Sequence, residues 1–101
     1  MEPQYEILSN TFKTLINPNA RLRKLGDGYL WAEGTTWVPD SAEAGGGYLL
    51  WSDIPNDRML RWSESDGTTI FRQPCGYTNG HTLDRENRLV SAEHGGRRIS
   101  R

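Results

Sequence analysis

Apolar residues gather on both sides of a short polar turn in residues 49–62. Residues 49–54 are rich in apolar and aromatic side chains, which suit a half-buried strand. The Pro-Asn-Asp of residues 55–57 is typical of a turn, because proline fixes φ and the other two residues tolerate turn conformations. Residues 58–62 alternate again and predict a second strand. The pattern therefore predicts a β-hairpin, and since an isolated hairpin is marginally stable in water, it must belong to a larger sheet.

The hairpin is part of a pattern that occurs almost twice. Glu33-Gly34 precedes one strand and the hairpin, and Asn79-Gly80 precedes a similar strand and a second hairpin over residues 88–101. The first copy continues with a fourth strand at residues 67–72, whereas the second copy stops before it. A period of about 40–50 residues made of four short strands is typical of a β-propeller blade.

The repeat predicts an all-β chain with three parts. Residues 1–28 form a lead-in, residues 29–78 the first blade and residues 79–101 an incomplete second blade. In the lead-in we expect a helix of about two turns after residue 9 or 10, docked on the β part. We also expect a strand at residues 21–25, which would complete the last blade of a closed propeller.

The length of the chain conflicts with a complete propeller. Repeat folds need about three or more units to bury their faces, and this chain holds about one and a half. The sequence therefore predicts the first third of a longer propeller. The alternative is a free-standing small β domain, whose open strand edges would pair with other copies.

Composition excludes several classes of partner. The net charge of −1 gives no global attraction to nucleic acid or to an anionic membrane. No long apolar run predicts a membrane span, and the single cysteine, Cys75, excludes an intrachain disulfide. The opening Met-Glu-Pro-Gln lacks the character of a signal peptide, so we expect a cytoplasmic protein, or a periplasmic one if a signal peptide lies upstream.

Four polar residues are predicted to gather at one end of the propeller channel, which the first strand of each blade lines. Glu33, Asn79 and His81 lie near the start of these strands, and His94 lies in a turn of a wider ring. Glu33 has aromatic neighbours and needs a partner, either a divalent cation, an arginine or solvent. For Asn79 the alternative is a simple turn, because Asn-Gly is a common turn pair. For His81 and His94 the alternative is a surface position.

Several motifs resemble the gluconolactonase, senescence-marker (regucalcin) and luciferin-regenerating family, in its bacterial gluconolactonase-like branch. The resemblance spans residues 12–101 and implies a six-bladed β-propeller, of which this chain holds the N-terminal part. It rests on these motifs: Trp31-Ala-Glu-Gly34 with Trp37, Leu50-Trp-Ser-Asp-Ile-Pro-Asn-Asp-Arg58 with Arg61-Trp62, Asn79-Gly80 with Thr82-Leu-Asp-Arg85, and Arg88-Leu-Val90 with Glu93-His94-Gly95 and Arg97-Arg98.

The resemblance also implies a function, a lactone hydrolase that converts sugar lactones to aldonic acids with one divalent cation. Calcium is the first choice, with magnesium, manganese or zinc as alternatives. Glu33 matches the family's first metal ligand, and Asn79 and His81 match positions that face the substrate pocket; His94 is added from its place on the rim. The other ligands, an Asn and an Asp, and the general base are expected beyond Arg101. Thr35-Thr36 departs from the family pattern and puts the shape of the metal loop in doubt.

The implied chemistry needs more than this chain. A bound cation polarises the lactone carbonyl and lowers the pKa of a water, and a carboxylate takes the water proton. With one ligand present, we expect the 101-residue chain alone to be inactive. Two other functions stay open, a non-catalytic propeller binding module and a self-associating β fragment.

Overall fold

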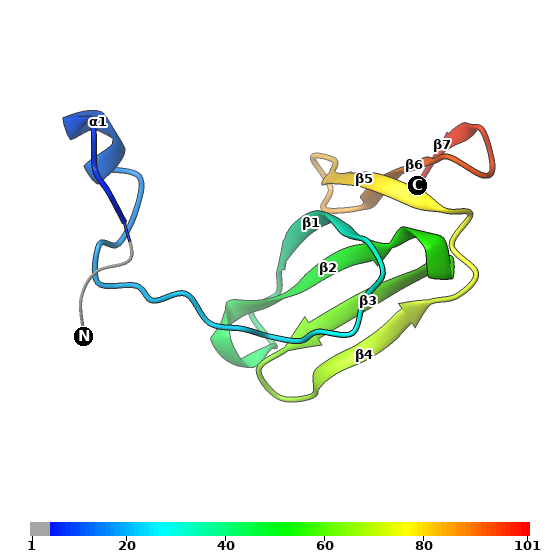
Figure 1. Ribbon diagram of the computed structural model, residues 1–101, viewed down its shortest axis with the longest axis horizontal. Coiled ribbons are helices and arrows are strands. Elements are labelled where there is room, and N and C mark those ends of the chain that lie inside the picture. Colours follow the sequence, from blue (N-terminus) through cyan, green and yellow to red (C-terminus); the bar gives the residue numbers. More distant parts are fainter. Residues whose placement is uncertain (1–4) are drawn as a thin grey trace.

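The computed structural model describes residues 5–101; the opening Met-Glu-Pro-Gln, on which the signal-peptide prediction rests, lies outside the described residues. The described chain folds into two antiparallel sheets that lie side by side, with the N-terminal segment extending away from them (Figure 1). The first sheet has the strand order β1-β2-β3-β4: β1 (Ala32–Pro39), β2 (Gly47–Asp53), β3 (Arg58–Ser63) and β4 (Gly67–Arg72). The second sheet has the order β5-β6-β7: β5 (Thr78–Leu83), β6 (Leu89–Glu93) and β7 (Arg98–Ser100). The predicted all-β fold is confirmed.

The central hairpin forms where the sequence predicted it. β2 and β3 pair in regular antiparallel register, with Leu50 opposite Arg61 and Asp53 opposite Arg58. A single 3-10 turn, η2 (Ile54–Asn56), connects them. A second one, η1 (Ala44–Gly46), lies in the loop before β2. The fourth strand also has the predicted bounds, residues 67–72.

The sequence repeat is also a structural repeat. Each first strand carries a β-bulge near its start, between Glu33 and Thr36 in β1 and between Thr78 and His81 in β5. The turn after each second strand donates a backbone hydrogen bond to the segment before the first strand. These bonds run from Ile54 N to Trp31 O and from His94 N to Tyr77 O, each 3.2 Å long. The predicted boundaries at residues 28/29 and 78/79 agree with this arrangement but stay predictions.

The N-terminal segment differs from its prediction. The helix α1 (Asn10–Lys13) makes about one turn and buries none of its residues, because no part of the sheets packs on it. The strand predicted at residues 21–25 is absent. This segment instead contacts the first sheet mainly through single bonds, such as Thr68 Oγ1 to Leu25 O at 3.3 Å, so it has no ladder of backbone hydrogen bonds to hold a strand.

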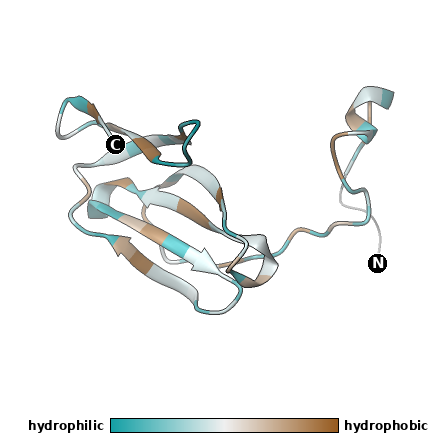
Figure 2. Ribbon diagram, turned by 180° about the vertical axis from the view of Figure 1, so that it is seen from behind, coloured by the Kyte–Doolittle hydropathy of each residue, from teal (hydrophilic) through white to brown (hydrophobic). Residues whose placement is uncertain are grey.

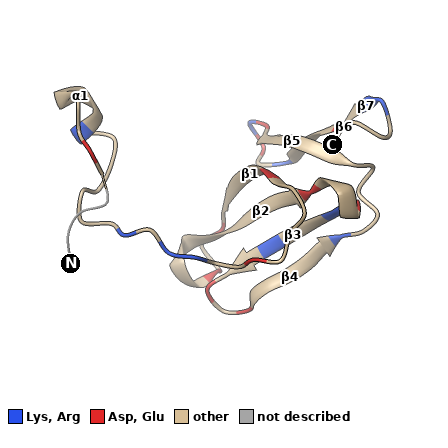
Figure 3. Ribbon diagram, viewed as in Figure 1, with Lys and Arg blue, Asp and Glu red and all other residues tan. Residues whose placement is uncertain are grey.

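The apolar core lies between the two sheets. It is built from Val38, Leu50, Met59 and Cys75, each buried. Tyr48, Leu83 and Leu89 pack around it, so both sheets contribute. Apolar residues form bands on the strands (Figure 2), and charges of both signs are spread over loops and strands (Figure 3). Among residues 5–101, no helix has the length and apolar character needed to cross a membrane.

Candidate functional site

Glu33 lies at the bulge of β1 with its side chain exposed to solvent. Within residues 5–101, no arginine or other side chain forms a hydrogen bond or an ion pair with its carboxylate. Its partner across the sheet is Ser52 on β2. The arginine partner considered from the sequence is therefore not found in the described part of the chain. A carboxylate without a protein partner is available to a cation or to water.

Gly34 connects Glu33 to the second sheet. Its φ of +68° lies in the left-handed region that glycine adopts readily, and a Cβ at this position would overlap the backbone carbonyl of Asn79. The absence of a side chain thus lets β1 approach β5 closely. Glu33 and Asn79 lie near the starts of equivalent strands, and this contact brings the backbones of the two strands close together there. The roles predicted for their side chains stay predictions. The side chain of Asn79 is exposed.

His81 occupies a position between the two sheets. Its Nε2 lies 2.7 Å from Ser52 Oγ on β2, and its Nδ1 lies 2.8 Å from Ser91 Oγ on β6. Ser52 Oγ also lies 3.0 Å from Thr78 Oγ1. Both ring nitrogens are therefore engaged within the protein. The sequence suggested a pocket residue or a surface residue, and nothing local indicated this network, because its hydroxyl partners come from separate strands.

The position of His81 affects its protonation. Burial lowers the pKa of the imidazole below its ordinary value of 6.5, and the positive charge of Arg72 lowers it further. The neutral ring is the form that can accept a hydrogen bond at one nitrogen and donate one at the other. The network therefore favours the neutral ring, with one serine hydroxyl donating and the other accepting.

We expect the stability of the chain to fall as the pH drops below about 6.5, the unfolded pKa of histidine. In this window the unfolded chain binds a proton that folded His81 resists, so unfolding becomes more favourable until the pH reaches the lowered folded pKa. Urea unfolding followed by circular dichroism between about pH 7.5 and pH 5 measures this slope. His81→Gln should flatten it and His94→Gln, at an exposed position, should not; an unchanged slope in His81→Gln would contradict the assignment.

Asn79 and His94 line an open hollow of about 570 Å³ on the second sheet. Glu93 and Arg98 contribute to it and form an ion pair at 3.2 Å. Hydrogen bonds from Ser100 and Arg98 lower the pKa of the Glu93 carboxyl, although burial opposes this. The hollow thus holds two of the four predicted site residues, while His81 points into the interface between the sheets.

Two carboxylates that hold the structure together, the buried Asp53 and the half-buried Asp57, were not identified from the sequence. Asp53 has no exposed side-chain surface and accepts bonds from the backbone N–H groups of Leu30 and Trp31, at 3.1 and 3.0 Å. Asn56 and Arg58 donate to its other oxygen at 2.8 and 3.0 Å. Burial alone would raise the pKa of this carboxyl, but the donors together outweigh burial and lower it.

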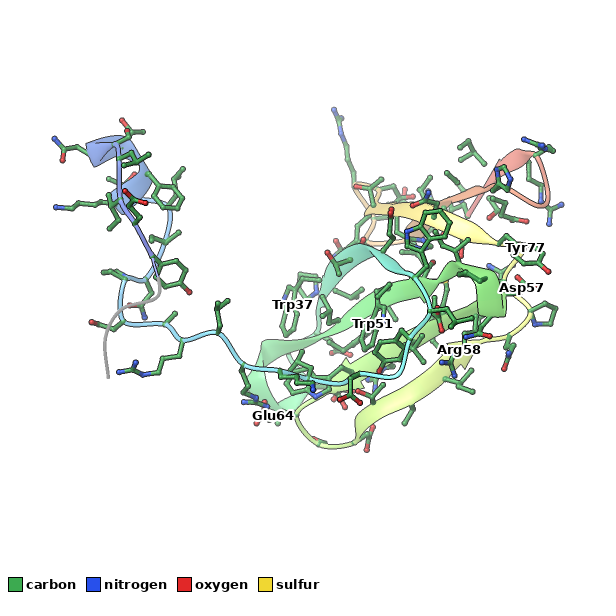
Figure 4. The ribbon with its side chains drawn as sticks, in the orientation of Figure 1. Trp37, Trp51, Asp57, Arg58, Glu64 and Tyr77 are labelled. Atoms are coloured by element: carbon green, nitrogen blue, oxygen red, sulfur yellow. The ribbon has the colours of Figure 1, made fainter. Side chains whose placement is uncertain are left out.

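Asp57 performs a related role at the tip of the hairpin. It has φ of +52°, and its Oδ1 accepts bonds from the N–H groups of Cys75 and Tyr77 at 3.1 and 2.8 Å. Figure 4 shows Asp57 beside Tyr77, and Tyr77 lies on the segment that connects the two sheets. Burial opposes ionisation, but these bonds outweigh it and lower the pKa of the carboxyl. Asp57 therefore fixes how the chain enters the second sheet.

The described residues fit a divalent cation only in part. Residues 5–101 contain no group of three or more His, Cys, Asp or Glu side chains arranged to hold a metal ion. Glu33 has the right chemistry, a free carboxylate oxygen donor of the kind that calcium and magnesium prefer. One such donor in contact with water binds a cation weakly, so any tight site needs donors beyond those that residues 5–101 bring together.

The fold and this site define a class, an all-β propeller-like protein built from repeated antiparallel sheets. Comparison with known proteins then gives the particular relationship: over the part it spans, the chain is similar to gluconolactonases. This confirms the resemblance predicted from the sequence motifs. No model of a known protein family matches the sequence.

The similarity is seen in both sequence and structure. A gluconolactonase of Zymomonas mobilis subsp. mobilis is 38% identical over 47 residues, which cover 46% of this chain and 12% of that protein. A gluconolactonase structure from Xanthomonas campestris, described as important in glucose secondary metabolic pathways, has a TM-score of 0.64 and 36% identity over 74% of this chain and 24% of its own. A structural-genomics structure described as a putative gluconolactonase has a TM-score of 0.66 and 32% identity over 76% of this chain and 25% of its own. The chain thus spans about a quarter of the length of these solved relatives.

Proposed function

We propose that this chain is part of a lactone hydrolase that acts on sugar lactones with the help of one divalent cation, calcium in the first place. The observation that carries the proposal is the free carboxylate of Glu33 at the bulge of β1, in a chain that is similar to gluconolactonases. The complete protein is proposed to be a six-bladed propeller, with the remaining ligands and the general base on other blades.

The proposal gives a role to each residue of the candidate site. Glu33 would hold the cation, which when bound polarises the lactone carbonyl and acidifies a water. Gly34 lets β1 approach Asn79 closely, so that the starts of β1 and β5 present their side chains together. Asn79 and His94 would contact the sugar hydroxyl groups from the hollow on the second sheet. His81 keeps the two sheets in register through its bonds to Ser52 and Ser91.

The test compares the 101-residue chain with the longer gene product that the proposal requires. We expect no hydrolysis of gluconolactone by the chain alone, because it supplies a single ligand. The longer product should hydrolyse the lactone and lose activity on chelation, with recovery when calcium is added. A gene product that ends at Arg101, or a longer one without lactone turnover, would falsify the proposal.

In the active longer product, Glu33→Gln is the decisive variant. Loss of a residue that only orients a metal ligand typically lowers metal affinity or activity about 10–100-fold. Loss of a ligand itself should therefore lower kcat/KM at least about 100-fold. The calcium concentration needed for half-maximal activity should also rise. The matched control is Glu86→Gln in the β5–β6 turn, where the side chain is exposed and pairs with Arg88 at 3.2 Å; it should change neither quantity. Equal effects of the two variants would remove Glu33 from the metal site.

A further inference from the structure

The tip of the first hairpin is bonded to the segment that leads into the second sheet. Asp57 Oδ1 accepts hydrogen bonds from Cys75 N at 3.1 Å and from Tyr77 N at 2.8 Å. The backbone carbonyl of Asp57 also accepts a bond from Cys75 N at 3.2 Å. One residue of the first hairpin thus fixes two backbone positions just before β5, and Figure 4 shows Asp57 and Tyr77 close together.

The same segment holds the turn that carries His94. Tyr77 O accepts a hydrogen bond from His94 N at 3.2 Å. Beside it, Gly76 O accepts a bond from Gly95 N at 2.9 Å. Asp57 and His94 are therefore linked through a single residue, Tyr77, which donates its N–H to the first and accepts the N–H of the second.

Residues 76 and 77 also pack tightly against this turn. A Cβ on Gly95 would lie 2.7 Å from the Tyr77 ring and 3.0 Å from Gly76 O. A Cβ on Gly76, where φ is +76°, would overlap Glu93 Oε1. Because even one added methyl group has no room on either side, a shift of residues 76–77 has to move the turn with them.

The backbone of Tyr77 has a conformation that needs support. Its φ of +51° lies in the left-handed region, which is uncommon for a residue with a side chain. Such a conformation persists where the surrounding structure holds it, and both backbone polar groups of Tyr77 are bonded, to Asp57 and to His94. Loss of the Asp57 carboxylate should therefore let Tyr77 relax, and the turn of His94 with it.

The two copies of the repeat hold the starts of their first strands differently. In the first copy, Asp53 accepts hydrogen bonds from the two N–H groups that precede β1, so the hairpin of the same sheet holds this segment. Glu93 has the equivalent place in the second copy, but its carboxylate is bonded within its own sheet. Asp57, from the preceding copy, takes over the N–H groups before β5. The place of His94 relative to the sheet that carries Glu33 thus depends on Asp57.

We infer that Asp57 is a positioning residue for substrate binding, which acts through Tyr77 to hold His94 in a fixed place relative to Glu33. The inference rests on the proposed function, because His94 contacts the sugar only in that proposal. In this role Asp57 itself contacts neither the lactone nor the cation. The contacts that link it to His94 join residues 57–95 directly and need no other part of the protein.

Steady-state kinetics of the active longer product with gluconolactone test the inference. Asp57→Ala should raise KM about tenfold, the equivalent of about one hydrogen bond to the sugar. It should leave kcat nearly unchanged, because contacts to the sugar hydroxyl groups bind substrate and transition state alike. The calcium concentration for half-maximal activity should not change. Asp57→Asn keeps an oxygen that accepts both N–H bonds, so it should have nearly the KM of the parent.

Asp84, in the turn between β5 and β6, provides the matched control. Its Oδ1 also accepts two backbone hydrogen bonds, from Glu86 N at 2.8 Å and from Arg88 N at 2.9 Å. This turn lies at the opposite end of β6 from His94. Asp84→Ala therefore removes a similar set of bonds and should leave KM unchanged.

A double-mutant cycle shows whether Asp57 acts through His94. His94→Gln alone should raise KM. Addition of Asp57→Ala to His94→Gln should raise it little further, because the two changes remove the same contact. Asp57→Gly replaces Asp57→Ala throughout if circular dichroism shows that the alanine variant is unfolded, since glycine adopts the φ of +52° readily.

An Asp57→Ala variant with the KM of the parent overturns the inference, and so does an equal rise of KM in Asp84→Ala. Additive effects of Asp57→Ala and His94→Gln also overturn it, since Asp57 would then act on the whole fold. In each of these cases the parent product is active, so the proposed function stands. An inactive parent product overturns the proposed function and this inference together.

Discussion

Gly34→Ala is expected to lower the free energy of unfolding by about 3 kcal/mol or more, since it combines left-handed strain with overpacking. The alanine Cβ would overlap the carbonyl of Asn79, a backbone atom that can move only if β5 moves with it. The φ of +68° adds the cost of a left-handed conformation for a residue with a side chain. The two sheets would have to separate locally, so the loss of stability should appear in both sheets.

The chain offers a matched control for this variant. Gly67 has the same φ of +68°, and a Cβ there would meet nothing within 4 Å. Gly67→Ala therefore carries the strain without the overlap and should cost only about 1 kcal/mol. Urea unfolding of both variants gives the difference, which isolates the contact between β1 and β5. Equal losses in the two variants would show that backbone strain alone accounts for the effect.

Asp53→Ala is expected to cost about 3–5 kcal/mol, the range for a buried ion pair that loses one partner. The variant leaves the backbone N–H groups of Leu30 and Trp31 and the guanidinium of Arg58 without their acceptor. Arg58 is 24% exposed, so water can reach only part of it. Without these hydrogen bonds, the segment that leads into β1 should become more mobile, and the position of Glu33 should become less fixed.

The control for this variant is Asp66→Ala. Asp66 also pairs with an arginine, Arg61, at 3.3 Å, but its side chain is 61% exposed. Exposed pairs contribute about 0–1 kcal/mol, so urea unfolding should show a small change. If Asp53→Ala were as mild as Asp66→Ala, the network around Asp53 would not hold the β2–β3 hairpin to the start of β1.

Much of the fold could be predicted because its signals are local. The Pro-Asn-Asp turn at residues 55–57 and the alternation on each side of it depend on neighbouring residues, and the hairpin formed as expected. The helix was predicted too long, because Phe12, Leu15 and Ile16 have helical spacing but no surface to pack on, and a short helix is marginal without packing. The spacing of apolar residues shows amphipathic character but not the presence of a partner.

The site could be predicted only in part. Glu33 and Asn79 were placed at the starts of equivalent strands because the repeat itself is visible in the sequence. The network of His81 could not be predicted, since Ser52 is on another sheet and serine hydroxyls carry no periodic signal. The role of Glu33 as a ligand stays a prediction, because the described residues contain no group of three or more His, Cys, Asp or Glu side chains arranged to hold a metal ion.

The bulge in β1 makes the strand sensitive to changes in length. Glu33 and Thr36 are three residues apart, yet they lie opposite Ser52 and Leu50, which are two apart on the same face of β2. A regular strand would place residues three apart on opposite faces. Loss of one of the two residues between them would leave the regular spacing of two, so the bulge would disappear and Glu33 would keep its face. Loss of both would place Glu33 and Thr36 on opposite faces and turn the carboxylate to the far side of the sheet. In this strand the number of residues therefore decides which face carries the Glu33 carboxylate, whereas the loop at residues 40–46 can vary in length without moving it.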